Sequence, residues 1–258
     1  LAICAFAINL IAGSKTVETL TGLDAGVVSL IMVLIAILYS FRTGLKATVM
    51  TEMIKMVVVW TGAIILVPWV ISNAGGWDVV VAGLGGKSMQ GADIFGTPFA
   101  WGVFTGFGAA AFLGHMGGPW GDNSFYQRAF AIKENSIIPS FVLASFVFIV
   151  VPIMMGLLGF VAAGTGMEIK NVGVTNALVI AEFLPAGAAI FFMFMVFAGL
   201  VSILDSQFSS VANMTGHDIY NKFKRGVWSN EIHWARYGMI ALAVIALIIA
   251  NIPGMTLL

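Results

Sequence analysis

Asp205 is notable because it is an acidic residue within a long apolar stretch. Residues 186–204, which precede it, contain Ser202 as their one polar side chain. An acidic side chain near the middle of a bilayer costs about 2.5–3.5 kcal/mol on insertion scales, so it requires a partner or a function. Further polar residues recur at steps of three or four, which places them on one face of a helix. They are Ser202, Ser206, Ser209, Asn213 and His217.

This polar row has two interpretations with different chemistry. Small polar side chains commonly hydrogen-bond between helices in membrane bundles, and the serines alone fit this interpretation equally well. Hydroxyl and carboxylate oxygens are also the ligands that hard cations take, Na⁺ among them. A carboxylate alone can carry a proton instead. Because Asp205 accompanies the hydroxyls, the row favours an ion or solute path, with Ser202, Asp205 and Ser206 as candidate ligands.

A second polar group lies in a glycine-rich stretch over residues 106–123. Gly117, Gly118 and Pro119 predict a kink or a break in a helix, because proline lacks an amide hydrogen and clashes with the preceding turn. Broken helices within a membrane occur only where they line a cavity. Close helix packing through glycine is the alternative. The predicted break favours a substrate cavity lined by His115, Gly118, Pro119, Asp122 and Asn123.

Glu52 and Lys55 form a third candidate at the start of another apolar run. They are three positions apart on the predicted helix and are therefore able to pair. An ion pair at the membrane surface is the simplest interpretation. A cytoplasmic gate or exit vestibule is the functional alternative.

Seven apolar runs position these residues. Apolar residues make up 60% of the 258 residues and charged residues 9%, and a water-soluble domain has no means of hiding so much apolar surface. Continuous runs near the length of a membrane-crossing helix predict helices, whereas a membrane barrel requires alternation. We therefore expect an all-α, polytopic transmembrane helix bundle in a single transporter domain truncated at both ends. Its predicted spans are about 1–13, 26–41, 47–72, 99–132, 137–164, 185–213 and 234–258.

Charge predicts the orientation of the bundle. The loops after the second, fourth and sixth runs, with their flanks, carry Arg42, Lys46, Arg128, Lys133, Lys222, Lys224, Arg225 and Arg236. The loops on the other side carry Lys15, Lys87 and Lys170. With Lys55 set aside, the positive-inside rule places the first group in the cytoplasm, and the glycine-rich connection 73–98 is expected to be an external loop.

Composition and motifs argue against two other functions. The net charge is zero and there is no basic tract, so nucleic acid is not an expected partner. The three histidines lack metal-ligand spacing, and the chain has no hydrolase, metalloprotease or phosphate-loop motif. We therefore do not expect an enzyme.

Three stretches together resemble the sodium:solute symporter family. The first is Tyr39-Ser40-x-x-Thr43-Gly44-Leu45-Lys46-Ala47-Thr48-Val49-x-Thr51-Glu52-x-x-Lys55. The second is Asp122-Asn123-x-x-Tyr126-Gln127-Arg128-Ala129. The third is Ala198-Gly199-x-x-Ser202-x-x-Asp205-Ser206, followed by His217-Asp218-Ile219-Tyr220. Their order and spacing agree with the family, so the resemblance covers almost the whole chain.

The resemblance implies a fold and a mechanism. Family members have the five-plus-five inverted repeat shared with the amino-acid transporter LeuT, of which this chain would cover core helices three (in part) to nine. It would carry a small polar organic solute by alternating access, with Na⁺ as the coupling ion. We expect an integral multi-pass protein of the bilayer of a bacterial cytoplasmic (inner) membrane. A sensor domain of a signalling protein, in which transport is secondary, is an alternative.

The resemblance also assigns roles to residues. Gly199 and Ser202 match positions that bind Na⁺ through a carbonyl and a hydroxyl, and Glu52 matches an acidic residue on the cytoplasmic Na⁺ exit route. The family's second hydroxyl position is Ile203, which cannot ligate through its side chain. Asp205 or Ser206 would have to compensate, and a proton-coupled or uncoupled carrier remains an alternative. His115, Gly118 and Pro119 stand where sugar-transporting members carry other residues, so a sugar is not the expected solute, and the second motif is nearer to the urea and small organic solute branches.

Overall fold

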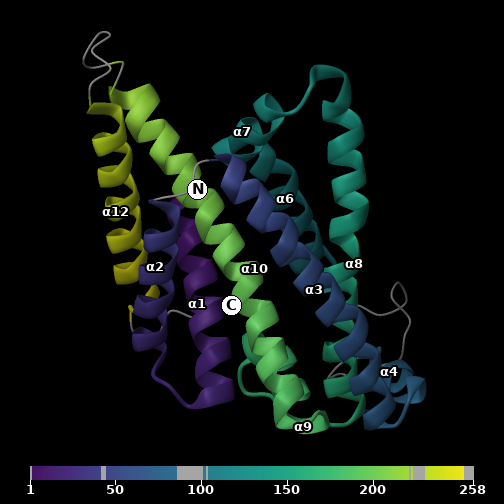
Figure 1. Ribbon diagram of the computed structural model, residues 1–258. Coiled ribbons are helices and arrows are strands. Elements are labelled where there is room, and N and C mark those ends of the chain that lie inside the picture. Colours follow the sequence, from purple (N-terminus) through teal and green to yellow (C-terminus); the bar gives the residue numbers. More distant parts are fainter. Residues whose placement is uncertain are drawn as a thin grey trace. The chain divides into compact units, whose positions relative to one another are not determined.

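The computed structural model describes residues 2–41, 45–85, 101–102, 104–220, 222 and 230–252. Within these ranges the regular secondary structure is entirely helical (Figure 1). The principal helices are α1 (Ala2–Thr21), α2 (Ala25–Ser40), α3 (Leu45–Ala74), α4 (Trp77–Gly83), α6 (Ala109–Gly121), α7 (Asn123–Ala131), α8 (Ile137–Gly164), α9 (Thr175–Phe183), α10 (Ala186–Asn213) and α12 (Glu231–Ala250). The prediction of an all-α polytopic helix bundle is confirmed.

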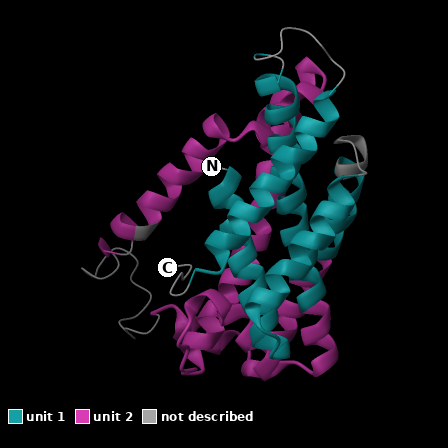
Figure 2. Cartoon of the chain, turned by 90° about the vertical axis from the view of Figure 1, so that its left-hand side faces the viewer, with its two compact units in different colours: residues 1–59, 193–258 teal, residues 60–192 magenta. Residues whose placement is uncertain are grey.

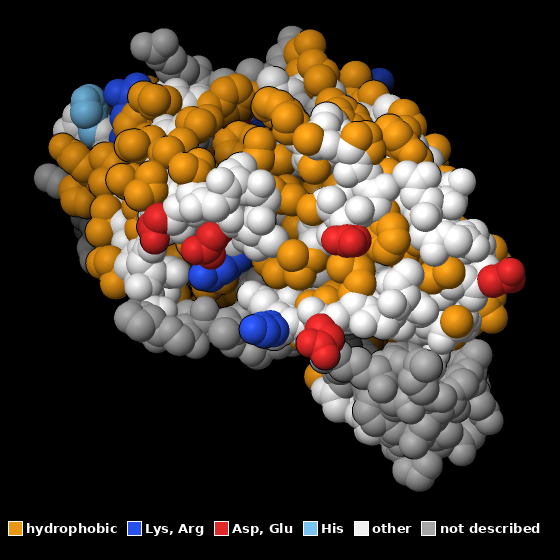
Figure 3. Space-filling view, turned by 90° about the horizontal axis from the view of Figure 1, so that it is seen from below, with side chains coloured by type: hydrophobic (Ala, Val, Ile, Leu, Met, Phe, Trp, Pro, Cys, Tyr) orange, Lys and Arg blue, Asp and Glu red, His pale blue; other side chains and the backbone are white. Residues whose placement is uncertain are grey.

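Five helices in the described part of the chain are long and apolar enough to cross a membrane. They are Ala2–Thr21, Val49–Ala74, Glu134–Gly164, Ala186–Ile219 and Glu231–Ala250. The predicted span 26–41 corresponds to α2, which is apolar but has only 16 residues. The predicted span 99–132 corresponds to a series of shorter helices rather than to one continuous helix. Figure 3, which looks at the molecule from below, shows hydrophobic side chains over much of that face with a few charged side chains among them.

The chain forms two compact units (Figure 2). Unit 1 comprises Leu1–Val59 and Met193–Leu258, and unit 2 comprises Trp60–Phe192. Helices α3 and α10 each contribute residues to both units.

Unit 1 has one apolar core, to which α1, α2, α10 and α12 all contribute. Phe6 of α1 and Phe208 of α10 are both fully buried, and their rings meet edge to face with centroids 4.7 Å apart. Met32 of α2 and Leu242 of α12 are buried in the same core. Because lipid is as apolar as these side chains, close van der Waals packing, more than exclusion from water, stabilises such a contact in a membrane.

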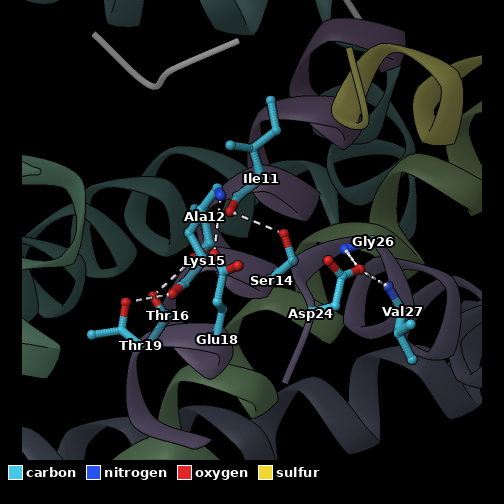
Figure 4. A network of polar contacts seen from close by, with 10 residues as sticks. All are labelled: Ile11, Ala12, Ser14, Lys15, Thr16, Glu18, Thr19, Asp24, Gly26 and Val27. Carbon is cyan, nitrogen blue, oxygen red and sulfur yellow. Dashed lines mark hydrogen bonds and ion pairs between the residues drawn. The ribbon is translucent and has the colours of Figure 1, made fainter. Parts of the chain in front are cut away.

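The first helix continues beyond the predicted end at residue 13, and its last two turns and the turn into α2 are held by local polar contacts (Figure 4). Hydroxyl groups on its last two turns donate to carbonyls three or four residues earlier, and so they remain compatible with a helix. These contacts run from Ser14 to Ile11, Thr16 to Ala12 and Thr19 to Lys15. The helix then ends before Gly22, whose φ of 74° lies in the left-handed region. Asp24 begins α2 by accepting hydrogen bonds from the amides of Gly26 and Val27.

Unit 2 contains a direct backbone contact between α4 and α8. A Cβ atom on Gly83 would lie 1.9 Å from the carbonyl oxygen of Phe160, and one on Gly164 would lie 2.0 Å from that of Val79. Only glycine allows the two backbones to approach this closely. The prediction of a loop over residues 73–98 is therefore wrong for residues 77–83, which form α4; most of the remaining predicted loop lies outside the described residues.

The glycine-rich stretch is interrupted at a different residue from the one predicted. Gly117, Gly118 and Pro119 lie inside α6, which continues to Gly121. The interruption falls at Asp122, whose backbone is extended, with φ −104° and ψ 111°. Its carboxylate accepts a hydrogen bond from the Ser124 amide at 2.8 Å and so begins α7. An aspartate that caps a new helix therefore sets the break, and the Gly-Gly-Pro sequence does not.

Candidate functional site

Asp205 is the centre of a polar cluster within unit 1. This residue belongs to α10 and is 2% exposed. The Nζ atom of Lys55 on α3 lies 2.7 Å from its Oδ2 atom, and the Ser40 hydroxyl at the end of α2 donates to its Oδ1 atom at 2.9 Å. Both carboxylate oxygens thus have partners from other helices. The pairing satisfies the requirement that a carboxylate at this depth be matched by a charge and by hydrogen bonds.

Ser206, the next residue on α10, links the same helix to Glu52 of α3. Its hydroxyl donates to the Oε1 atom of Glu52 at 2.7 Å and lies 3.0 Å from the carbonyl oxygen of Ser202. A hydroxyl has a single proton and two lone pairs. The shorter contact, to a carboxylate, is the stronger charge-assisted bond. Ser206 therefore brings a carbonyl, a hydroxyl and a carboxylate oxygen close together.

Two residues of the first motif complete the cluster. The hydroxyl of Tyr39 on α2 hydrogen-bonds with that of Thr51 on α3. The Nζ atom of Lys55 also lies 5.1 Å from the centroid of the Tyr39 ring, within the range of a cation–π contact. Tyr39, Ser40 and Thr51 were not among the predicted site residues, although all three occur in the first motif. Only a long-range contact distinguishes them from the rest of that motif.

The surroundings of Glu52 and Lys55 differ from those expected of an ion pair at the membrane surface. The side chain of Lys55 is 18% exposed and pairs with α10 instead of lying at the surface. Glu52 is half-buried and accepts from Ser206. These two residues therefore connect α3 to the polar row of α10.

The polar row of α10 divides into two parts. Ser202, Ser206 and Ser209 are half-buried, whereas Asn213, the last residue of α10, and His217, in the π-helical turn Met214–Ile219 that follows, are exposed. The Nδ1 atom of His217 lies 3.8 Å from the Oε1 atom of Glu231, at the start of α12. Gln207 and Ser210 are buried polar residues on the same helix that the three-to-four spacing did not select. Ile203, at the position of the family's second hydroxyl, is 40% exposed.

The predicted substrate-cavity residues belong to unit 2, whereas the residues of the Asp205 cluster belong to unit 1. His115, Gly118 and Pro119 are spaced at three and four residues on α6, so they share a face of that helix. The Nδ1 atom of His115, which is exposed, contacts the carbonyl oxygen of Ala111 in its own helix at 2.8 Å. Asp122 and Asn123 are half-buried where α6 gives way to α7.

The unit 1 cluster around Asp205 presents hard oxygen ligands. Among the described residues, no group of three or more His, Cys, Asp and Glu side chains is placed to hold a metal ion. The cluster instead combines hydroxyl and carbonyl oxygens with two carboxylates. Hard cations prefer such oxygen ligands.

The model of the sodium:solute symporter family matches residues 1–255. This chain belongs to the sodium:solute symporter family. No curated protein matches the chain. Membership makes it an integral, multi-pass membrane transporter from a family that moves solutes together with Na⁺.

The family match confirms the resemblance drawn from the three motifs. In this symporter the first and third motifs meet, because Ser40, Glu52 and Lys55 contact Asp205 and Ser206. The second motif belongs to unit 2 and contributes the capping aspartate Asp122.

Proposed function

We propose that this symporter couples Na⁺ entry to the uptake of a small polar organic solute by alternating access. The proposal includes the inverted-repeat fold of LeuT and a location in the cytoplasmic membrane of a bacterium. Family membership supports the class of transport. The observation that carries the assignment to this region is the contact of Ser206 with both Ser202 and Glu52.

The proposed Na⁺ ligands lie on α10. They are the Gly199 carbonyl oxygen, the Ser202 and Ser206 hydroxyls and the Asp205 carboxylate. The Ser206 hydroxyl is already 3.0 Å from a backbone oxygen and 2.7 Å from a carboxylate oxygen, so a cation here finds several oxygens within a small volume. Such a set replaces the hydration shell of a hard cation.

Glu52 and Lys55 would form the cytoplasmic end of the ion path. They lie on the segment of α3 that follows the predicted cytoplasmic loop, and each contacts α10. Breaking these contacts would separate α3 from the polar row of α10 and expose that row. Contacts that form in one state and break in another are what a gate requires.

The solute would bind against the interrupted helices of unit 2. His115, Gly118 and Pro119 on α6, with Asp122 and Asn123 at the start of α7, offer an imidazole, a carboxylate and an amide. Interrupted helices supply backbone ligands in many transporters. These groups suit a small polar solute that donates and accepts hydrogen bonds.

Uptake into proteoliposomes that contain the complete protein tests the proposal. Labelled urea, amino acids and short carboxylates are offered with a Na⁺ gradient or a pH gradient imposed separately, and a hexose serves as comparison. We expect uptake of at least one polar solute to follow the Na⁺ gradient. Ser202→Ala should then raise the half-saturating Na⁺ concentration by about tenfold, the loss expected from one ligand worth about 1.4 kcal/mol.

A proton-coupled carrier is the second candidate, and Ile203 favours it because the position lacks a ligating oxygen. Uptake that follows only the pH gradient would contradict the Na⁺ assignment. Ile203→Ser separates the two candidates further. A Na⁺-coupled protein should gain Na⁺ affinity from the added hydroxyl, whereas a proton-coupled one should not respond.

A further inference from the structure

Lys55 places a positive charge where the proposed cation site has its most buried carboxylate. Its Nζ atom is 2.7 Å from the Oδ2 atom of Asp205, whose side chain is 1% exposed. Ser40 donates to the other carboxylate oxygen at 2.9 Å. A monovalent cation, the lysine ammonium, is therefore already bound to Asp205 by its own chain.

An ammonium and a Na⁺ ion compete for such a carboxylate. Two unit positive charges a few ångströms apart repel one another strongly in a partly buried site, where water screens them poorly. Both also seek the oxygen lone pairs of the same group. Na⁺ can bind to Asp205 without a large penalty only if the ammonium moves away.

Lys55 is able to move away without a shift of its helix. Its charge is carried on a flexible four-carbon stem, and 18% of its side chain is exposed, against 1% for Asp205. While it is paired with Asp205, its Nζ atom also lies 5.1 Å from the centroid of the Tyr39 ring, a favourable contact that does not depend on the carboxylate. An exchange of cations at Asp205 thus requires mainly side-chain rotation.

We propose that the Lys55 ammonium is a tethered cation that competes with Na⁺ for Asp205 and so sets the Na⁺ affinity of this symporter. The inference rests on the proposed Na⁺ site on α10. With lysine in place, α3 is held on α10. When Na⁺ occupies Asp205, Lys55 is released and that connection is lost. Lys55 is in this way a determinant of ion affinity as well as a member of the gate.

Binding of ²²Na⁺ to the purified complete protein in lipid nanodiscs tests the inference without a known solute. Displacement by NaCl, with choline chloride holding the ionic strength constant, gives the Na⁺ affinity. Lys55→Met removes the competing charge and should tighten Na⁺ binding by at least about tenfold. Lys55→Arg keeps the charge and should stay within about threefold of the wild type.

Two further variants identify the cause of a gain. Lys15→Met removes a lysine from a half-buried pair with Glu18 on α1, and it should leave Na⁺ binding unchanged. Adding Asp205→Asn to Lys55→Met should abolish the gain, since the contested carboxylate is then absent. Gel filtration checks folding, and Lys55→Gln, which keeps a hydrogen-bond donor for Asp205, replaces Lys55→Met if that protein aggregates.

The outcomes separate this inference from the proposed function. Unchanged or weaker Na⁺ binding in Lys55→Met, or an equal gain in Lys55→Arg, would overturn the tethered cation even where wild-type uptake follows Na⁺. A gain in Lys55→Met together with wild-type uptake that ignores the Na⁺ gradient would support the tethered cation and contradict Na⁺ coupling.

Discussion

Helices α10 and α6 both place polar side chains in an apolar run, yet these side chains have different surroundings. On α10 the Asp205 residue is 2% exposed, and its carboxylate receives partners from α2 and α3. In α6, which is described throughout, no residue is buried. Its His115 contacts a carbonyl oxygen of its own helix.

The difference shows how charge determines packing in an apolar chain. An unpaired carboxylate is expensive in a membrane, so α10 requires other helices to supply a cation and donors. An imidazole, glycines and a proline impose no such requirement, and α6 remains exposed. The large apolar side chains of α6, such as Leu113 and Trp120, are exposed as well and suit contact with lipid or another helix. The Asp205 cluster thus takes its partners from α2 and α3, whereas the side chains of α6 are exposed or half-buried.

Removing the charge of Asp205 should have the largest effect on stability. Asp205→Asn leaves the Lys55 ammonium without its partner, and removing one member of a buried ion pair costs about 3–5 kcal/mol. We expect a clear fall in the apparent melting temperature in nanodiscs. The double variant Lys55→Met/Asp205→Leu should recover most of the loss, because an apolar pair needs no partner. A melting temperature unchanged by Asp205→Asn would contradict the comparison.

A glycine substitution in unit 2 should have the next largest effect. Gly83→Ala forces a methyl group to within 1.9 Å of the Phe160 carbonyl oxygen, and overpacking of this kind costs about 1–3 kcal/mol or more. Gly159→Ala on α8 is the matched control, because a Cβ atom there meets nothing within 4 Å. Thermal unfolding should separate the two. Equal melting temperatures would show that α4 and α8 do not touch at Gly83.

His115→Ala should have the smallest effect on stability. An exposed side chain with a contact only to its own helix is usually worth within about 0.5 kcal/mol. The melting temperature should stay near that of the wild type, while solute uptake falls if His115 lines the cavity. A loss of stability close to that of Asp205→Asn would mean that α6 is as tightly partnered as α10.

Local patterns in the sequence predicted the helical class and the need of Asp205 for a partner, but not the partner itself. The length of an apolar run predicts a membrane helix. An acidic residue within such a run predicts a partner, because an unpaired carboxylate there costs free energy. Lys55 and Ser40 are 150 and 165 positions away from Asp205, respectively. Helical periodicity carries no information on contacts at such separations. It therefore paired Lys55 with the nearest acid, Glu52.

The predicted helix break was placed at the wrong residue, because the sequence signals for a weak helix and for a new helix lie close together. Gly-Gly-Pro weakens a helix but does not end it, whereas Asp122 supplies a cap for the next helix. Helix propensity and helix capping can favour different boundaries, and here the Asp122 cap determined where α7 begins. Helix α4 was missed because the glycine-rich connection 73–98 suggested a loop, although Gly83 also permits the backbone contact with α8.

The central claim, that the oxygens of α10 next to Glu52 hold the coupling ion, is tested most directly by ²²Na⁺ binding to Ser206→Ala. Ser145→Ala on α8 is the matched control, since the Ser145 hydroxyl is exposed and, among the described residues, bonds only to the Phe141 carbonyl oxygen of its own helix. We predict that Ser206→Ala weakens Na⁺ binding by about tenfold or more, as the loss of a bond worth about 1.5–3 kcal/mol requires, and that Ser145→Ala has no effect. Wild-type Na⁺ affinity in Ser206→Ala would contradict the account.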